Sequence, residues 1–360
     1  MNILVNLTKE FRGCGFYRLY QPHFDLAKKK LTTVTLNSGL WKADKVPMTD
    51  EEVKKFDIII WHKGFFDIND IRRAKRLGVI TIADFDDHWI LDPGHTLRES
   101  YRKENTSAKL HRLLLEADYV TCTTEDLADE IYYSNKNVEV LPNAMDMSYP
   151  FTKVERQKED KFVFGYLGGH FHLNDVRLLR GLQKELSELN GYNLRLFGYD
   201  GTFVYNEYAS ILSDGDPKNP NFSIYKGMDI FAYPHFYNLM DCSLVPLTDN
   251  RFNRFKSELK MIEAGFFKKA VIVSNVKPYT NVINKDNCLI VNDRKDWSKY
   301  CQTLIENPEL AKELGENLFK SVQEYSIDNV NKKRFQFYSD VHKKHNINSS
   351  IGACRLEVVN

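Results

Sequence analysis

Short apolar runs rich in valine and isoleucine alternate with helical patterns along this sequence, and that alternation restricts its fold more than any other feature. Five runs lie in the first half, at residues 3–5, 33–36, 56–62, 79–83 and 117–122. Five more lie in the second half, near residues 162–167, 193–199, 240–247, 270–273 and 288–291. Strands that alternate with helices form parallel sheets with right-handed crossovers. Because 360 residues exceed the usual size of one hydrophobic core, the pattern predicts two doubly wound α/β domains.

The charge balance and the cysteines argue against several classes of partner and site. The formal net charge is +1, so no global attraction toward nucleic acid or an anionic membrane is expected. The six cysteines form no CxxC pair, which argues against a zinc site and favours reduced thiols. The first residues are typical of a strand rather than a signal peptide, and no apolar run is long enough to span a bilayer. We therefore expect a cytoplasmic protein with at most peripheral membrane contact.

The segment at residues 250–279 predicts a helix that leads into a buried strand. Apolar side chains recur at three- and four-residue steps and predict one buried stripe, formed by Phe255, Leu259, Ile262 and Phe266. Lys256, Lys260 and Glu263 recur at the same spacing and are expected on a different face. The β-branched run at 270–273 is typical of a parallel strand.

Two lysines and a glutamate beside such a strand could bind a sugar nucleotide. The ammonium groups of Lys256 and Lys260 would meet the diphosphate, and the carboxylate of Glu263 would accept hydrogen bonds from ribose hydroxyls. A solvated helix face with an ordinary Lys–Glu pair would show the same pattern. The spacing by itself leaves both interpretations open.

Glycine-bearing turns follow the first strand of each predicted domain. Gly13 and Gly15 precede Arg18 in the first turn, and Gly168 and Gly169 form the second. Glycine lets the backbone approach a ligand closely, although a tight turn also requires it. A helix is expected over residues 174–189, and the free amides at its start would suit a diphosphate.

Three polar or aromatic side chains near the second turn have two interpretations each. His172 and Asp175 either contact a ligand or form a His–Asp pair at the surface. Tyr199, at the end of the next predicted strand, either stacks on a nucleotide base or lies at the rim of the site.

An acidic cluster follows the strand at 79–83, in the order Asp84, Phe85, Asp86, Asp87 and His88. The carboxyl ends of strands are where open α/β sheets place active-site groups. Three interpretations compete for the cluster: a metal site of the DxD type, an acid/base or acceptor-binding group, and a helix N-cap. We favour the second.

The segment at 250–279 resembles the donor-site helix and strand of glycosyltransferase family 4, the retaining nucleotide-sugar enzymes with the GT-B fold. Glu263 in the sequence IEAG matches the ribose-binding glutamate of that family. The Lys256-Ser257…Lys260 pattern, followed by Val273-Ser274 and Pro278-Tyr279, resembles a lysine-rich branch. Many members carry a second glutamate eight positions before the first, and that position is Phe255 here. Residues 138–146 resemble the strand and following turn that close the first domain in this family, with Ala144 in place of the usual glycine.

This resemblance implies two Rossmann-like domains that face an interdomain cleft, with acceptor binding in residues 1–150 and donor binding in 151–325. A helix over 326–345 would cross back to the first domain, ahead of a tail at 346–360. The implied donor-binding residues are Gly168, Gly169, His172, Tyr199, Lys256, Ser257, Lys260 and Glu263. The implied acceptor-binding residues are Gly13, Gly15 and Arg18, and the implied catalytic residues are Asp86, Asp87, His88 and Lys260.

The implied activity is transfer of a sugar from a UDP- or GDP-sugar to a hydroxyl acceptor, without a metal or other cofactor. A glycan or lipid-linked acceptor in surface polysaccharide or glycoconjugate synthesis is the favoured use. A protein or a modified nucleic-acid base could instead be the acceptor, and the near-zero net charge gives this little support. A sugar-nucleotide epimerase and a non-catalytic binding module would share the same fold, and the Phe255 departure favours the module.

Overall fold

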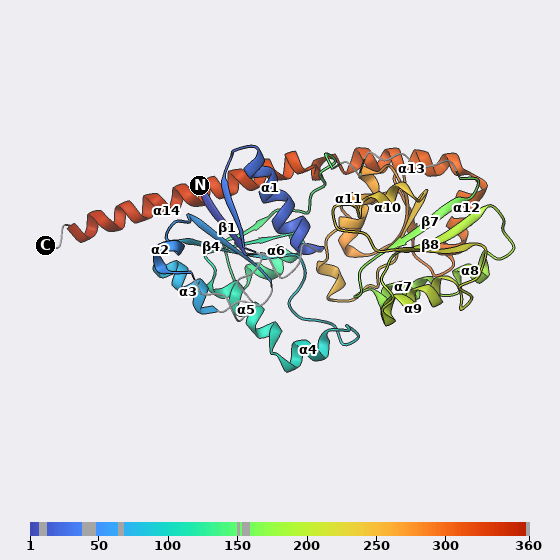
Figure 1. Cartoon of the computed structure of the whole chain (residues 1–360), viewed down its shortest axis with the longest axis horizontal. Coiled ribbons are helices and arrows are strands. Elements are labelled where there is room, and N and C mark those ends of the chain that lie inside the picture. The colour runs from blue at the N-terminus through green and yellow to red at the C-terminus, as the bar shows by residue number, and fades with distance from the viewer. Residues whose placement is uncertain (7–12, 38–47, 64–67, 150–151, 153–158, 358–360) are drawn as a thin grey trace. The chain divides into compact units, whose positions relative to one another are not determined.

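The computed structural model describes residues 1–6, 13–37, 48–63, 68–149, 152 and 159–357. The chain divides into two compact units (Figure 1). Unit 1 contains Met1–Ile90, Ser100–Ala144 and Ile327–Asn360, and unit 2 contains Leu91–Glu99 and Met145–Ser326. Residues 148–161, whose polar and charged composition predicts a linker between the domains, lie mostly outside the described residues.

Unit 1 is built on a six-stranded sheet in the order β2-β1-β3-β4-β5-β6, and all of its strand pairs are parallel. The strands are β1 (Asn2–Asn6), β2 (Thr33–Asn37), β3 (Ile58–His62), β4 (Ile80–Phe85), β5 (Tyr119–Cys122) and β6 (Val138–Val140). The strand order reverses between β1 and β3, which is where ligands bind in sheets of this kind. The register places His62 beside Asp84, and Asp84 beside Thr121.

Helices cover both faces of this sheet (Figure 1). They are η1 (Gly15–Tyr20), α1 (Gln21–Lys28), α2 (Asp50–Val53), α3 (Ile68–Arg76), α4 (Arg98–Lys103), α5 (Thr106–Glu116), α6 (Glu125–Tyr132) and α14 (Ile327–Glu357). Helix α14 returns to unit 1, where Tyr338 and Val341 join the core formed by β1, β3 and β4. The helix expected over 326–345 thus begins at Ile327 and continues to Glu357.

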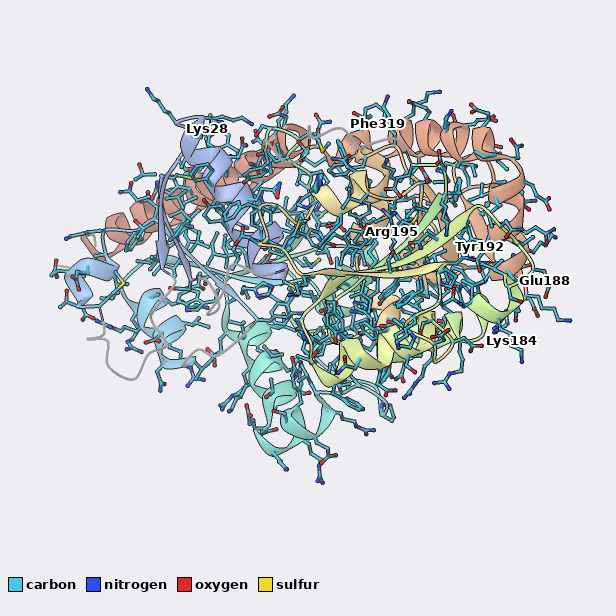
Figure 2. All side chains as sticks on the ribbon, turned by 45° about the vertical axis from the view of Figure 1, so that its right-hand side comes forward. Lys28, Lys184, Glu188, Tyr192, Arg195 and Phe319 are labelled. Carbon is cyan, nitrogen blue, oxygen red and sulfur yellow. The ribbon has the colours of Figure 1, made fainter. Side chains whose placement is uncertain are left out.

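Unit 2 contains a second six-stranded parallel sheet, in the order β12-β11-β10-β7-β8-β9. The strands are β7 (Phe162–Leu167), β8 (Tyr192–Tyr199), β9 (Phe222–Lys226), β10 (Cys242–Val245), β11 (Ala270–Ser274) and β12 (Leu289–Val291). Its order reverses between β7 and β10, so the residues that follow these two strands flank the expected ligand position. Tyr192 and Arg195 of β8 are buried within the unit (Figure 2).

The helices of unit 2 lie on both sides of its sheet, with α11 and α13 on one face and α7, α8 and α9 on the other (Figure 1). They are α7 (Leu173–Val176), η3 (Arg177–Leu179), α8 (Leu182–Glu185), α9 (Phe203–Leu212), α10 (His235–Asn238), η4 (Asn253–Phe255), α11 (Leu259–Phe266), η5 (Lys277–Tyr279), α12 (Asp296–Glu306), α13 (Pro308–Ser321) and η6 (Gln323–Tyr325). The two parallel sheets confirm the predicted fold class. Among the described residues, no helix combines the length and the apolar character needed to cross a bilayer.

Two helices differ from the sequence-based expectation. The continuous helix predicted over 174–189 is three short pieces, and Gly181 has a φ of 79° between them, in the left-handed region. The helix predicted from residue 255 onward begins at Leu259, because Lys256 is in an extended conformation after a short 3₁₀ turn. Lys256 therefore does not share a helix face with Lys260 and Glu263.

Candidate functional site

The glycine turn after β7 is fixed by two tyrosines of α9. The hydroxyl groups of Tyr205 and Tyr208 donate to the carbonyl oxygens of Gly168 and Gly169, each at 2.8 Å. The hydroxyl oxygen of Tyr208 also accepts a hydrogen bond from the backbone N–H of His172, at 3.1 Å. The peptide planes of the turn are thereby held from the α9 side.

Gly168 allows a lysine and a tyrosine to lie against the turn. A Cβ carbon at this position would lie 2.4 Å from the hydroxyl oxygen of Tyr166 and 3.2 Å from Nζ of Lys260. A Cβ carbon on Gly169 would meet nothing within 4 Å. The hydroxyl of Tyr166 is buried and has no hydrogen-bond partner among the described residues. Burial also raises the pKa of Tyr166 well above its usual value, so this hydroxyl stays protonated.

Lys260, on the first turn of α11, is a largely buried cation. Its Nζ lies 5.3 Å from the centroid of the Tyr166 ring. Within the described part of the chain, the ammonium forms no hydrogen bond or ion pair. Burial lowers the pKa of Lys260 to about 8; the positive charge of Lys256 acts in the same direction, while Asp175 and Glu263 oppose it. An anion bound beside Gly168 would supply the missing partner.

His172 and Asp175 form a buried pair, not the pair at the surface that the sequence also allowed. Nδ1 of His172 lies 2.7 Å from one carboxylate oxygen of Asp175, whose residue is only 3% exposed. The other oxygen accepts hydrogen bonds from the backbone N–H of Thr248, at 2.8 Å, and from Nδ2 of Asn253, at 3.2 Å. Burial opposes ionisation of Asp175, but the hydrogen bonds from His172 and Thr248 outweigh it and lower its pKa.

Glu263 is 1% exposed and faces the interior of unit 2. One carboxylate oxygen accepts hydrogen bonds from the hydroxyl groups of Tyr237, at 2.8 Å, and Tyr233, at 3.3 Å. The solvated Lys–Glu face that the spacing left open is thus excluded, because the carboxylate is enclosed. Glu263 is close enough to Lys260 to raise the pKa of that lysine.

The remaining predicted donor-site residues lie around this centre. Lys256 and Ser257 are half-buried on the segment before α11, and Nζ of Lys256 lies 4.9 Å from the centroid of the Phe252 ring. Tyr199, at the end of β8, donates its hydroxyl to Asn206 at 2.6 Å. Its ring meets that of Tyr205 edge-on, with centroids 6.3 Å apart.

The sequence analysis missed several residues of this site. In the sequence, Tyr166 belongs to a predicted strand, and Thr248 and Asn253 have no pattern that distinguishes them from loop residues. All three are polar residues near the carboxyl ends of β7 and β10, the two strands between which the sheet order reverses. That position is the one sequence signal that could have identified them. The hydroxyl of Thr248 is also buried and has no hydrogen-bond partner among the described residues.

In unit 1, the side chain of Arg18 is buried and paired within the unit. Its side chain is 0% exposed, and its Nε and Nη2 bind the two carboxylate oxygens of Asp84 at 3.1 and 2.6 Å. Its Nη1 donates to the carbonyl oxygen of Leu141. The guanidinium is thus bound by β4 and by the chain after β6, and the assignment of Arg18 to acceptor binding stays a prediction.

Asp86 and Asp87 share a lysine that the sequence analysis did not single out. Nζ of Lys63, the residue after β3, lies 2.5 Å from Asp86 and 2.6 Å from Asp87. Nε2 of His62 lies 3.4 Å from the same oxygen of Asp86. Burial opposes ionisation of Asp86, but Lys63 and His62 outweigh it and lower its pKa well below the usual value. Asp86 is therefore ionised, and both side chains already pair with the ammonium of Lys63.

The arrangement gives little support to the metal interpretation of this cluster. In the described ranges, no group of three or more His, Cys, Asp or Glu side chains is arranged to hold a metal ion. The ammonium of Lys63 lies between the carboxylates, where a metal would have to bind.

His88, for which the family resemblance implies a catalytic role, is buried and bound within unit 1. Its Nδ1 accepts a hydrogen bond from the backbone N–H of Ile90 at 3.0 Å, and its Nε2 lies 3.3 Å from Glu130 of α6. Its ring stacks on Trp89 with centroids 4.5 Å apart, and the side chain is fully buried. Both ring nitrogens thus have a neighbour within unit 1, and the catalytic assignment of His88 stays a prediction.

The glycines of the first turn start a helix. Gly13 has a φ of 45°, in the left-handed region, and its carbonyl oxygen accepts hydrogen bonds from Phe16 and Tyr17, each at 3.1 Å. Gly15 is buried as the first residue of η1. The structure thus shows Gly13 as the residue that allows the sharp turn into η1.

Comparison with known proteins identifies the fold. No family model matches this sequence, and no curated protein matches it. Among solved structures, sucrose-phosphate synthase from Thermosynechococcus elongatus has a TM-score of 0.69 and 15% identity, over 96% of this chain and 100% of that one. The Anabaena protein HepE, in complex with UDP and glucose, has a TM-score of 0.64 and 12% identity, over 94% of this chain and 99% of that one.

A third similar structure is TarM from S. aureus, in complex with fondaparinux, α-GlcNAc-glycerol and UDP. Its TM-score is 0.58 with 13% identity, over 78% of this chain and 55% of that one. The protein thus has the GT-B fold of these structures. Membership of glycosyltransferase family 4, which the motifs suggested, stays a prediction.

Proposed function

We propose that this protein is a glycosyltransferase that binds a nucleotide-diphosphate sugar in unit 2 and transfers the sugar to a hydroxyl acceptor. The observation that carries the proposal is the largely buried ammonium of Lys260 beside the turn at Gly168, which has no ion-pair partner among the described residues. A buried cation without a partner costs free energy, and a diphosphate would remove that cost. The similar structures of HepE with UDP-glucose and of TarM with UDP support this choice of ligand.

The donor-site residues then have distinct roles. Lys260 and the amides of Gly168 and Gly169 bind the diphosphate and stabilise the charge that develops on it as the glycosidic bond breaks. Glu263, which two tyrosines orient, accepts hydrogen bonds from the ribose. Lys256 and Ser257 add a second contact to the phosphates, and Tyr199 provides the aromatic surface for the base. A UDP- or GDP-sugar fits these roles.

Asp86 and Asp87 are the proposed catalytic groups of unit 1. Lys63 pairs with both carboxylates and helps to keep Asp86 ionised, so that Asp86 can accept a hydrogen bond from the acceptor hydroxyl. We propose a retaining reaction, because the donor-site motif resembles that of retaining enzymes, and a glycan or lipid-linked acceptor in polysaccharide or glycoconjugate synthesis. The TarM complex, which contains a glycerol-linked sugar, supports an acceptor of this class.

A non-catalytic nucleotide-sugar-binding module is the second candidate, and Phe255 favours it. This half-buried phenylalanine occupies the position where many related donor sites carry a glutamate near the sugar. The two candidates share the donor site and differ in turnover. Transfer of a labelled sugar to any hydroxyl acceptor would establish the enzyme, whereas tight binding without transfer or hydrolysis would establish the module.

Calorimetry and thermal shift against UDP-, GDP-, ADP- and CMP-sugars test the donor site. We expect one nucleotide series to bind the wild-type protein and to lose its affinity in Lys260→Met. Lys312→Met is the matched control, because Lys312 is an exposed lysine of α13 that pairs with Glu309. If no nucleotide sugar binds the wild-type protein, or if the two variants bind equally well, the proposal fails.

A further inference from the structure

The imidazole of His172 is held in one tautomer by its contact with Asp175. Nδ1 lies 2.7 Å from a carboxylate oxygen that is ionised, and an ionised carboxylate can only accept a hydrogen bond. Nδ1 therefore carries the proton. In the neutral ring, Nε2 then has a free lone pair and acts as a hydrogen-bond acceptor.

The orientation of the ring is fixed from two sides. Asp175 is held by the N–H of Thr248 and the amide of Asn253, so its carboxylate does not turn away from His172. The backbone N–H of His172 is bound to the hydroxyl of Tyr208. The side chain of His172 keeps 17% exposure, so one edge of the ring stays within reach of a ligand.

The surroundings of His172 keep the ring neutral. Burial lowers its pKa to about 4; the positive charges of Lys260 and Lys256 act in the same direction, and the opposing effect of Asp175 is smaller. Within the described residues, no group forms a hydrogen bond to Nε2. A hydrogen-bond acceptor therefore lies in a site whose other groups, the ammonium of Lys260 and the hydroxyl of Tyr166, are donors.

A diphosphate cannot satisfy this acceptor, because its oxygens carry negative charge and have no proton to donate. A hydroxyl group has a proton and can donate the hydrogen bond that Nε2 accepts. The ribose hydroxyls are already matched to the carboxylate of Glu263, so the hydroxyls that remain on a nucleotide sugar are those of the transferred sugar. Thr248, whose backbone N–H is bound to the other oxygen of Asp175, has a buried hydroxyl that also lacks a partner among the described residues.

We propose that Nε2 of His172 accepts a hydrogen bond from a hydroxyl of the transferred sugar and so determines which sugar the protein selects. Asp175 is the positioning residue for this contact, and the hydroxyl of Thr248 is a second contact to the same sugar. This inference rests on the proposed nucleotide-sugar function and adds the group that recognises the sugar rather than the nucleotide.

The test compares a nucleoside diphosphate with its sugar conjugate. Binding of UDP and of UDP-glucose, or of the GDP pair if guanine is the base, is measured by calorimetry for His172→Phe and for the wild-type protein. We expect the dissociation constant of the diphosphate to stay within about twofold, and that of the nucleotide sugar to rise about tenfold, as for one lost hydrogen bond. Donors that lack one sugar hydroxyl should show the same loss in the wild-type protein and no further loss in the variant.

Two further variants serve as controls. His172→Gln places an amide oxygen near the position of Nε2 and should restore part of the affinity for the sugar. His170→Phe removes the other histidine of the same turn, which pairs with Asp200 at 2.6 Å and is about as exposed as its partner, and should change neither affinity. Far-UV circular dichroism and the melting temperature confirm that each variant is folded.

Three results would overturn the proposal in distinguishable ways. Equal weakening of diphosphate and nucleotide sugar in His172→Phe would assign the ring to the nucleotide. Unchanged binding of both would show that the ring contacts neither. If no nucleotide or nucleotide sugar binds the wild-type protein, the proposed function fails, and the sugar contact fails with it.

Discussion

Gly168 and Tyr166 lie so close together that a Cβ carbon on the glycine would be 2.4 Å from the hydroxyl oxygen of the tyrosine. The same carbon would be 3.2 Å from Nζ of Lys260. The turn after β7 can therefore lie against a buried hydroxyl and a buried ammonium because this residue has no side chain. Gly169, the next residue, has open space at the equivalent position.

Gly168→Ala should weaken both the fold of unit 2 and nucleotide binding. The added methyl group forces Tyr166 or Lys260 to move, and overpacking of this kind costs about 1–3 kcal/mol. We expect a lower melting temperature and a reduced thermal shift with UDP or GDP. Gly169→Ala is the matched control and should resemble the wild-type protein in both measurements. Equal effects of the two substitutions would contradict the geometry at Gly168.

Lys260→Met should stabilise the ligand-free protein while it abolishes diphosphate binding. Lys260 has a pKa of about 8 in the folded chain and 10.5 as its ordinary value, so its protonated form is disfavoured by folding. At about pH 7 this pKa difference lowers the free energy of unfolding by roughly 3 kcal/mol. The uncharged methionine should recover part of that loss. Chemical denaturation at that pH measures the gain in the free energy of unfolding.

The exposed control for this measurement is Lys312→Met. Lys312 pairs with Glu309 within one turn of α13, and such surface pairs contribute about 0.5 kcal/mol or less. The two lysine variants should therefore differ clearly in stability and in nucleotide binding. A destabilised Lys260→Met protein would mean that the ammonium already has a partner in solution and needs no bound anion.

Local patterns were sufficient to predict most of the fold. The apolar runs predicted ten of the twelve strands. The glycine turns follow β1 and β7, the strands at which the order of each sheet reverses, and Lys260 lies beside the second of these turns. Strand β9 (Phe222–Lys226) was missed because its alternating, half-exposed side chains give a weak signal at the edge of the sheet. The helix predicted over 174–189 was interrupted because Gly181 adopts a left-handed conformation.

Several predicted site residues have partners that are distant in the sequence and that no local pattern predicted. Arg18 follows a glycine turn and resembled a ligand contact, yet its partners are Asp84 and Leu141, which are 66 and 123 positions away. His88 is adjacent in sequence to two functional candidates, but Ile90 and Glu130 occupy its nitrogens. Such pairings depend on the register of the sheet and on helix packing, which no local pattern contains.

Arg18→Met should destabilise unit 1 by about 3–5 kcal/mol, since it leaves the carboxylate of Asp84 buried without its partner. Burial opposes the ionisation of Asp84, and Arg18 is the larger of the effects that nevertheless lower its pKa. A lower melting temperature or denaturation midpoint measures this loss. Nucleotide affinity should be unchanged at temperatures where the variant is folded.

Two comparisons make the Arg18 prediction specific. Arg254→Met removes an arginine whose pairing with Asp249 is exposed, and it should change the free energy of unfolding by about 0.5 kcal/mol or less. The double variant Arg18→Met, Asp84→Leu removes both buried charges and should recover much of the lost stability. If the double variant is as unstable as the sum of the single variants, the two side chains do not act as a pair.

Diphosphate affinity should decrease as the pH rises through about 8, the pKa of Lys260 in the ligand-free protein. Below that pH the ammonium is charged and attracts the diphosphate; above it the amine is neutral, and affinity should fall by up to about tenfold per pH unit until the pKa of the complex is reached. Two other groups contribute little, because the terminal phosphate of UDP, with a second pKa of about 6, is mostly ionised at about pH 7, and His172, with a pKa of about 4, is already neutral. Calorimetry from about pH 7 to 9.5 measures the profile. Lys260→Arg keeps its charge throughout this range and should give a flat profile, so a decline of equal slope in the arginine variant would assign the titration to another group.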